Sequence, residues 1–210
     1  MARWTAKEMV LNIASTKEAI LFLEALQKQI KIVDIIADYY PGKITIRFEG
    51  VKEKLMDALE ITKNLHQMIY AMLYPNNSNY YEYNITQLSK MTGKTFPIQI
   101  LLNVLEFQGY KAFKEEEAFF STIDYDKLIN VITLIDQTLT NMPYEVSTSS
   151  LRDVIATIAV AQGITNEEAI SKARKIKIVE EDDLQRLKLS IAPDQALEKS
   201  LKLNVITEKN

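Results

Sequence analysis

The chain has 210 residues and no cysteine, which excludes disulfides, thiolate-ligated zinc and thiol catalysis. A single histidine, His66, is present, so a histidine metal site or a Ser–His–Asp triad would depend on that residue alone. The five glycines form neither GxGxxG nor a P-loop, which argues against nucleotide binding through those loops. Neither sign of charge dominates: 25 basic and 28 acidic residues leave a net charge of −3, unlike a histone-like nucleic-acid binder.

Long apolar runs are also missing. No stretch approaches the roughly 18 apolar residues that a membrane span needs. The first residues lack the apolar core of a signal peptide and include an acid. We therefore expect a cytoplasmic protein with no membrane partner.

Residues 1–75 show the pattern of a β-α-β-β-α domain of the ferredoxin or KH type. Alternating apolar residues predict strands near 9–13, 32–39 and 44–48, and apolar residues at helical spacing predict helices that follow Ser15 and Gly50. Ser15 and Glu18 have the spacing of a capping box at the start of the first helix. The order predicts an α+β layer in which two helices cover one face of a sheet.

Residues 76–143 begin within a linker, Pro75–Asn79, and predict a winged-helix-like domain. One helix is expected between Asn84 and Gly93, and a second, capped by Thr95, between Pro97 and Gly109. A short hairpin around an acidic turn and a trailing helix over 125–139 complete the pattern.

Residues 144–210 predict a mostly helical unit. A helix over 149–162 ends at Gly163, and Thr165 and Glu168 form a capping box for the next helix. A short hairpin containing Leu187 and Leu189 precedes a last helix that begins at Pro193 and carries Leu201 on its apolar face.

These caps, glycine stops and apolar spacings resemble an uncharacterized archaeal family, the domain of unknown function 2067. The likeness covers nearly the whole chain and is carried by residues 84–93, 95–109, 149–152 and 163–169. No catalytic signature takes part in it. The resemblance implies an archaeal source and supplies no functional residues.

His66 has no partner with metal-ligand spacing, because Ile69 and Tyr70 occupy the positions one helical turn later. The acidic runs 115–117 and 180–183 lack the alternating ligands of a calcium loop and predict solvated turns. The tyrosines near the first linker favour packing over base stacking. We therefore predict no metal, no cofactor and no catalytic residue.

Basic residues mark the candidate nucleic-acid surface. The densest group lies near the C-terminus, and two more cations alternate with the apolar residues of a predicted strand, so they would lie on the uncovered sheet face. Asp34 and Asp38 would dilute that second group. The candidate nucleic-acid-binding residues are Lys172, Arg174, Lys175, Arg186, Lys188, Lys43 and Arg47.

The second helix of the winged-helix-like segment predicts no reading of duplex DNA. Most of its residues are apolar, and it leaves Gln99, Asn103 and Glu106 outward as candidate partner-binding residues. It carries no Arg or Lys to hold a phosphate, and the expected wing tip is Glu115-Glu116-Glu117. Residues 74–143 contain five basic and eight acidic residues. We expect this helix to pack against neighbouring segments or a protein.

The sequence thus predicts a non-catalytic adaptor that binds RNA or a ribonucleoprotein through several small domains. The ribosome is one ribonucleoprotein with which such an adaptor would associate. The alternative is a protein–protein interaction scaffold or homodimer that uses the winged helix and an exposed sheet edge, without nucleic acid. The prediction of an RNA-binding adaptor rests on fold analogy, because small α+β and winged-helix domains often bind RNA or ribonucleoproteins.

Overall fold

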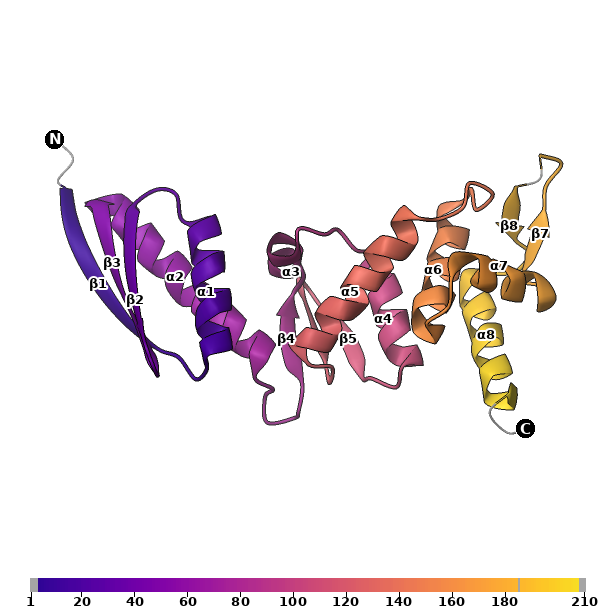
Figure 1. Cartoon of the computed structure of the whole chain (residues 1–210), viewed down its shortest axis with the longest axis horizontal. Coiled ribbons are helices and arrows are strands. Elements are labelled where there is room, and N and C mark those ends of the chain that lie inside the picture. The colour runs from indigo at the N-terminus through magenta and orange to yellow at the C-terminus, as the bar shows by residue number, and fades with distance from the viewer. Residues whose placement is uncertain (1–3, 185, 208–210) are drawn as a thin grey trace. The chain divides into compact units, whose positions relative to one another are not determined.

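A computed structural model describes residues 4–184 and 186–207 of the chain, with side chains described as far as Ser200. The chain forms two compact units, Met1–Asn84 and Ile85–Asn210. The architecture is α+β, as predicted, with small antiparallel sheets (Figure 1). The predicted division into three domains stays a prediction.

The first unit has the predicted β-α-β-β-α order, followed by a short strand. Its elements are β1 (Trp4–Asn12), α1 (Thr16–Gln29), β2 (Asp34–Tyr40), β3 (Lys43–Val51), α2 (Lys52–Leu73) and β4 (Tyr81–Asn84). The strands pair antiparallel in the order β1-β3-β2. Both long helices lie on the same side of this sheet, so its other side is open (Figure 1).

The core of the first unit lies between the sheet and the two helices. Alternation along β3 buries Ile44, Ile46 and Phe48 against Phe22 of α1 and Leu55 of α2. The strand predicted near residues 44–48 is longer than expected, because β3 continues through Gly50 to Val51. A Cβ atom at Gly50 would lie 3.0 Å from Cγ1 of Val33, so this position requires close backbone approach.

The second unit begins with the helices and hairpin expected between residues 84 and 140. These are α3 (Ile85–Thr92), α4 (Ile98–Phe107), the antiparallel pair β5 (Ala112–Glu115) and β6 (Ala118–Ser121), and α5 (Tyr125–Thr140). The cap predicted at Thr95 is wrong: Pro97 holds the N-cap position of α4, and no side chain caps it. A proline tolerates this place because its missing N–H would have no helical partner.

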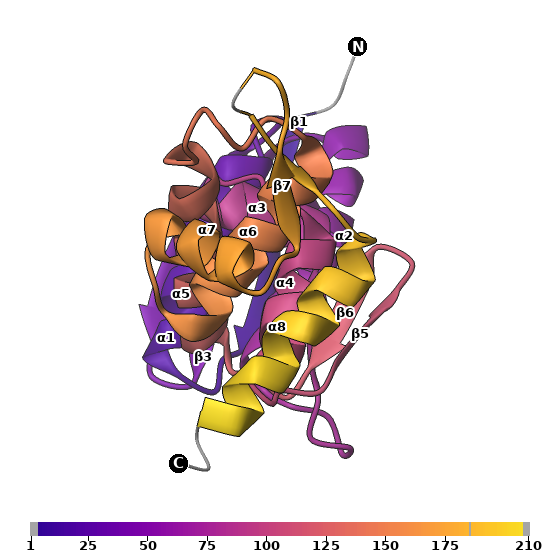
Figure 2. The same cartoon turned by 90° about the vertical axis from the view of Figure 1, so that its right-hand side faces the viewer.

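The rest of the second unit packs around one central helix. The elements are α6 (Ser149–Gln162), α7 (Asn166–Lys175), β7 (Val179–Glu181), β8 (Leu187–Leu189) and α8 (Pro193–Thr207) (Figure 2). Seven consecutive residues of α6, Val154–Val160, are buried, because α4, α5, α7 and α8 all contact this helix. The side chain of Leu201, expected on the apolar face of α8, lies outside the described residues.

Candidate interaction surfaces

The strand register of the first unit defines which residues lie on the open face of its sheet. Because Ile44, Ile46 and Phe48 face the helices, the alternate residues of β3 face outward, together with their neighbours on β1 and β2. The strand register places Lys43 and Arg47 on this face, as predicted. The open face comprises Trp4, Ala6, Glu8, Val10 and Asn12 on β1, Asp34, Ile36, Asp38 and Tyr40 on β2, and Lys43, Thr45, Arg47, Glu49 and Val51 on β3.

Four large apolar side chains of the open face are more than half exposed. Trp4 is 64% exposed, Val10 56%, Ile36 55% and Tyr40 54%. The last three occupy neighbouring rows, since Tyr40, Val10 and Ile36 lie beside Lys43, Thr45 and Arg47 respectively. Trp4 lies at the far end of the sheet, beside Val51. Large exposed apolar side chains gathered on one face are typical of an interaction surface.

The charge of the open face is negative. Glu8, Asp34, Asp38 and Glu49 supply four carboxylates against the two cations Lys43 and Arg47, which leaves a net charge of −2.

Both cations of the open face also interact within the chain. The guanidinium of Arg47 lies 2.8 Å from a carboxylate oxygen of Glu49. Nζ of Lys43 lies 5.7 Å from the centre of the Tyr40 ring. A phosphate would therefore meet more carboxylates than cations on this face.

Three cations of the C-terminal basic group pair with the acidic run 180–183. Arg174 lies 2.8 Å from Glu181 and 3.7 Å from Glu145. Lys188 lies 3.2 Å from Glu180 across the β7–β8 hairpin. This hairpin brings Glu180 and Glu181 to the cations, and residue spacing alone does not reveal these pairs.

The other members of this group differ in their surroundings. Arg186 lies 3.3 Å from Asp182, whose pKa is lowered chiefly by the hydrogen bond that the Arg186 backbone N–H donates. Lys172 donates to Oε1 of Gln162 at 2.8 Å, and burial lowers the pKa of its ammonium. Lys175 lines a pocket with Arg174 and Glu167. The structure thus places Arg174, Arg186 and Lys188 against carboxylates, whereas Lys172 donates to an amide oxygen.

The outward residues of α4 are where the sequence placed them. Gln99 and Glu106 are exposed and Asn103 is half-buried, with the Gln99 amide donating to Oδ1 of Asn103 at 3.0 Å. The opposite side of α4 buries Ile100, Leu101, Val104 and Leu105 and contacts α5 and α6. Packing against neighbouring segments, one of the two uses predicted for this apolar helix, is therefore observed.

His66 has a partner outside its own helix, which residue spacing along α2 does not show. Its Nε2 lies 3.1 Å from Oε1 of Glu18 and 3.1 Å from the Asn12 carbonyl oxygen. Glu18 is fully buried, and its other oxygen accepts from the Ala14 N–H at 2.9 Å. The sequence separation of 48 residues explains why helical spacing could not reveal this pair.

The hydroxyl groups of Tyr74 and Ser15 extend the hydrogen-bond network of Glu18. The Tyr74 hydroxyl donates to Oγ of Ser15 at 2.8 Å, and that Oγ accepts from the Glu18 N–H. The network therefore joins the start of α1 to both the middle and the end of α2. Across the part of the chain that the structure describes, no three His, Asp or Glu side chains are grouped to hold a metal ion.

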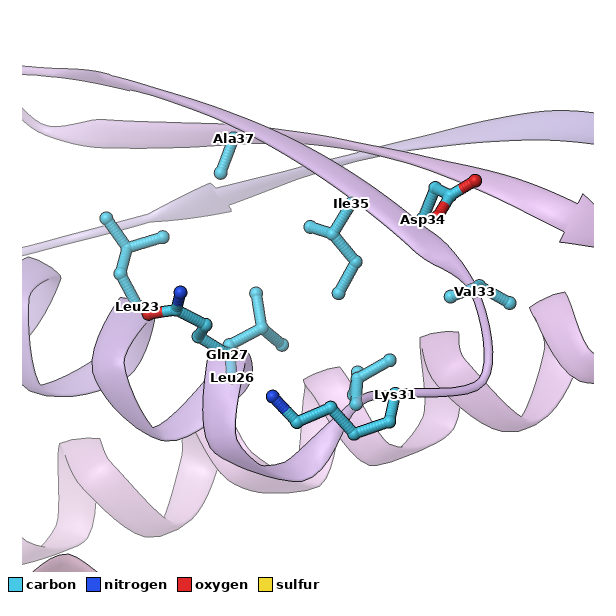
Figure 3. Close-up of a pocket in the computed structure, with 9 residues that line it drawn as sticks. Leu23, Leu26, Gln27, Lys31, Val33, Asp34, Ile35 and Ala37 are labelled. Carbon is cyan, nitrogen blue, oxygen red and sulfur yellow. The ribbon is translucent and has the colours of Figure 1, made fainter.

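A pocket of about 350 Å³ lies between α1 and β2 in the first unit. Ile35 and Ala37 point from β2 toward α1, from which Leu23 and Leu26 face them (Figure 3). Lys31 and Asp34 are the only charged residues of its lining. The volume is at the lower end of the range for small-molecule sites, and Gln27, Lys31 and Asp34 add polar groups to the apolar side chains of its walls.

Fold and surfaces together describe an α+β chain with an open sheet face in its first unit and a helix-centred second unit. A family model matches residues 11–198, and the chain belongs to that family, the domain of unknown function 2067, described as an uncharacterized protein conserved in archaea. No functionally curated protein and no solved structure matches the chain. Over the residues that the structure describes, no helix combines the length and hydropathy needed to cross a membrane.

Proposed function

We propose that the chain is a non-catalytic adaptor that binds a protein partner through the open face of its first unit. One observation carries the proposal: four large apolar side chains are exposed on a sheet face whose net charge is −2. Apolar contact supplies affinity, and charge complementarity supplies orientation and specificity. The partner therefore presents an apolar patch surrounded by Lys or Arg side chains.

The same face gives RNA less support. Trp4 and Tyr40 could stack on bases, and single-stranded RNA is often recognised in this way. Phosphate attraction, however, requires an excess of cations. The open face has two cations against four carboxylates, and each cation already contacts a side chain of the same sheet.

The second unit contributes a winged-helix-like segment in this proposal. The order α3, α4, β5–β6 supports it, and the contacts of α4 with α5 and α6 support a packing role for the helix that usually reads DNA. The exposed acidic turn between β5 and β6 would repel a phosphate backbone. A cytoplasmic location is part of the same proposal.

Site-specific crosslinking in an extract of source cells tests the proposed face. A photo-crosslinking amino acid replaces Ile36 on the open face, and a second protein carries it at Asn64, which is exposed on α2. We expect ribonuclease-resistant adducts with a basic protein at position 36, absent at position 64 and lost on Val10→Asp. Equal labelling at both positions, or adducts that ribonuclease removes, would overturn the proposal.

A charge reversal separates the two classes of partner. Lys43→Glu adds a carboxylate to the open face, so capture of a basic protein stays the same or increases, whereas binding of RNA decreases. The RNA probe is a fluorescent oligouridylate, titrated at low salt with anisotropy as the readout. Saturable binding that Lys43→Glu weakens would favour RNA and contradict our proposal.

A further inference from the structure

The two outer strands of the first unit's sheet differ in how their free edges are protected. β1 carries Lys7 on the side of the helices, where its Nζ lies 3.1 Å from Sδ of Met56. An inward-pointing charge of this kind discourages pairing with another strand. β2 has the sequence DIIADYY, with no Lys, Arg or Pro, and its register with β3 runs through seven residues without a bulge. Among the described strands of this sheet, β2 is therefore the one with an unprotected edge.

The turn between β2 and β3 determines which groups of β2 point outward. Pro41 and Gly42 form a two-residue connection, so Tyr40 and Lys43 are a hydrogen-bonded pair and alternate pairs follow from it. Ile36 and Asp38 then direct their N–H and C=O groups to β3. Ile35, Ala37 and Tyr39 direct theirs to the free edge.

Apolar side chains accompany this edge on the helix side. Ile35 and Ala37 point toward α1 and line the pocket there (Figure 3), and the Tyr39 hydroxyl lies 3.2 Å from Oγ1 of Thr16. Along α1, Ile20 lies one turn after Thr16 and one turn before Leu23, and it is 53% exposed. A strand added at this edge would bury these apolar groups.

We propose that the strand added to this edge is β2 of a second copy of the chain, related by a two-fold axis. An antiparallel pair centred on Ala37 matches outward groups with outward groups and pairs all seven residues of β2. It places Asp38 opposite the partner's Ile36 and Asp34 opposite the partner's Tyr40. Ile35 lies beside the partner's Tyr39, so the apolar side chains of both copies meet.

The charges of β2 select this register. A two-fold axis at Ile36 would place Asp34 opposite the partner's Asp38. An axis at Asp38 would place Asp38 opposite the partner's Asp38. Like charges directly opposite each other destabilise a strand pair. The strand thus permits one full-length pairing with itself, and the product is a continuous six-stranded sheet.

Sedimentation and light scattering of the full chain test this dimer. We expect the mass of two chains at the highest soluble concentration. Ala37→Lys places two ammonium groups side by side at the axis, and Ala37→Asp places two carboxylates there, so each variant alone becomes monomeric. An equimolar mixture of the two variants restores the dimer, because the charges are then opposite. Val10→Lys, on β1 and away from this edge, is the control and leaves the mass unchanged.

Hydrogen exchange adds a residue-specific readout. We expect the amides of Ile35, Ala37 and Tyr39 to gain protection as the concentration rises, while those of Ile36 and Asp38 are already protected by β3. A monomer at every concentration, or a dimer that Ala37→Lys leaves intact, would overturn the inference. Either result leaves the proposed open-face function untouched, because that function is tested at Ile36, Val10 and Lys43.

Discussion

The buried network of Glu18 and His66 gives the sharpest test of how the first unit is held together. Glu18 accepts from the Ala14 N–H at 2.9 Å and lies 3.1 Å from Nε2 of His66, with no exposure to water. Glu18→Ala removes both interactions and leaves the Ala14 N–H and the His66 ring nitrogen without this acceptor. We therefore expect a loss of about 3–5 kcal/mol in the free energy of unfolding. Glu18→Gln keeps the shape but can accept only one of the two hydrogen bonds, which costs about 1–3 kcal/mol.

A double-mutant cycle isolates the contact between the two side chains. His66→Ala also removes the edge contact of its ring with Phe22, whose centroids lie 5.7 Å apart, so the single substitution overstates the pair. Combined with Glu18→Ala, the cycle should give a coupling free energy of about 1–3 kcal/mol. The exposed pair Arg47–Glu49 in the same unit is the control, with an expected coupling below about 1 kcal/mol.

Urea unfolding followed by tryptophan fluorescence measures these values. A chain of two units need not unfold in one transition. Trp4 is the only tryptophan and lies in β1, so its signal reports the first unit alone. A coupling free energy for Glu18 and His66 no larger than that of the exposed control would refute the reasoning that burial makes this contact strong.

Three further predictions concern the second unit. Asp124→Ala removes the N-cap of α5 and costs about 0.5–2 kcal/mol by thermal unfolding. The Lys127 backbone N–H lowers the pKa of Asp124, so this stabilisation is present above the carboxyl's unfolded pKa and is lost as the pH falls through the folded value. Gly163→Ala forces a side chain into a residue with φ of 64° and costs about 1 kcal/mol in the same assay, whereas a neutral result would contradict the left-handed cap. Mixed-sequence duplex DNA shows no shift in a gel assay at low salt, and binding abolished by Gln99→Ala with Asn103→Ala would contradict the packing role of α4.

The two capping boxes show where sequence reasoning succeeds and where it stops. Thr165 and Glu168 form the complete reciprocal box that their spacing predicted, because both hydrogen bonds are local. Ser15 accepts from the Glu18 N–H as predicted, but the Glu18 carboxylate bonds the Ala14 N–H and reaches His66 on α2. That second contact requires two helices to pack on one sheet, which no local spacing can show.

The interaction surfaces divide in the same way. Strand alternation placed Lys43 and Arg47 on the open face, and the register confirms it. The same alternation along β1 and β2 could have identified Trp4, Val10, Ile36 and Tyr40, had the exposed apolar residues been considered with the basic ones. The α4 face was also predictable, because helical spacing fixes Gln99, Asn103 and Glu106.

The C-terminal cations show why a count of basic residues overestimates phosphate binding. Three cations of this group, Arg174, Arg186 and Lys188, pair with the carboxylates of Glu145, Glu180, Glu181 and Asp182, so +3 and −4 leave a local charge of −1. Breaking an exposed ion pair costs at most about 1 kcal/mol, so the pairs themselves do not block a ligand. The obstacle is the local electrostatic potential. Phosphate affinity comes from cations in excess, and each carboxylate that stays in place cancels one of them.

The open face also lacks an excess of cations, with a net charge of −2, but it adds exposed apolar area that phosphate cannot use. A partner with its own apolar patch and cations uses both features, which is why we favour a basic protein over RNA.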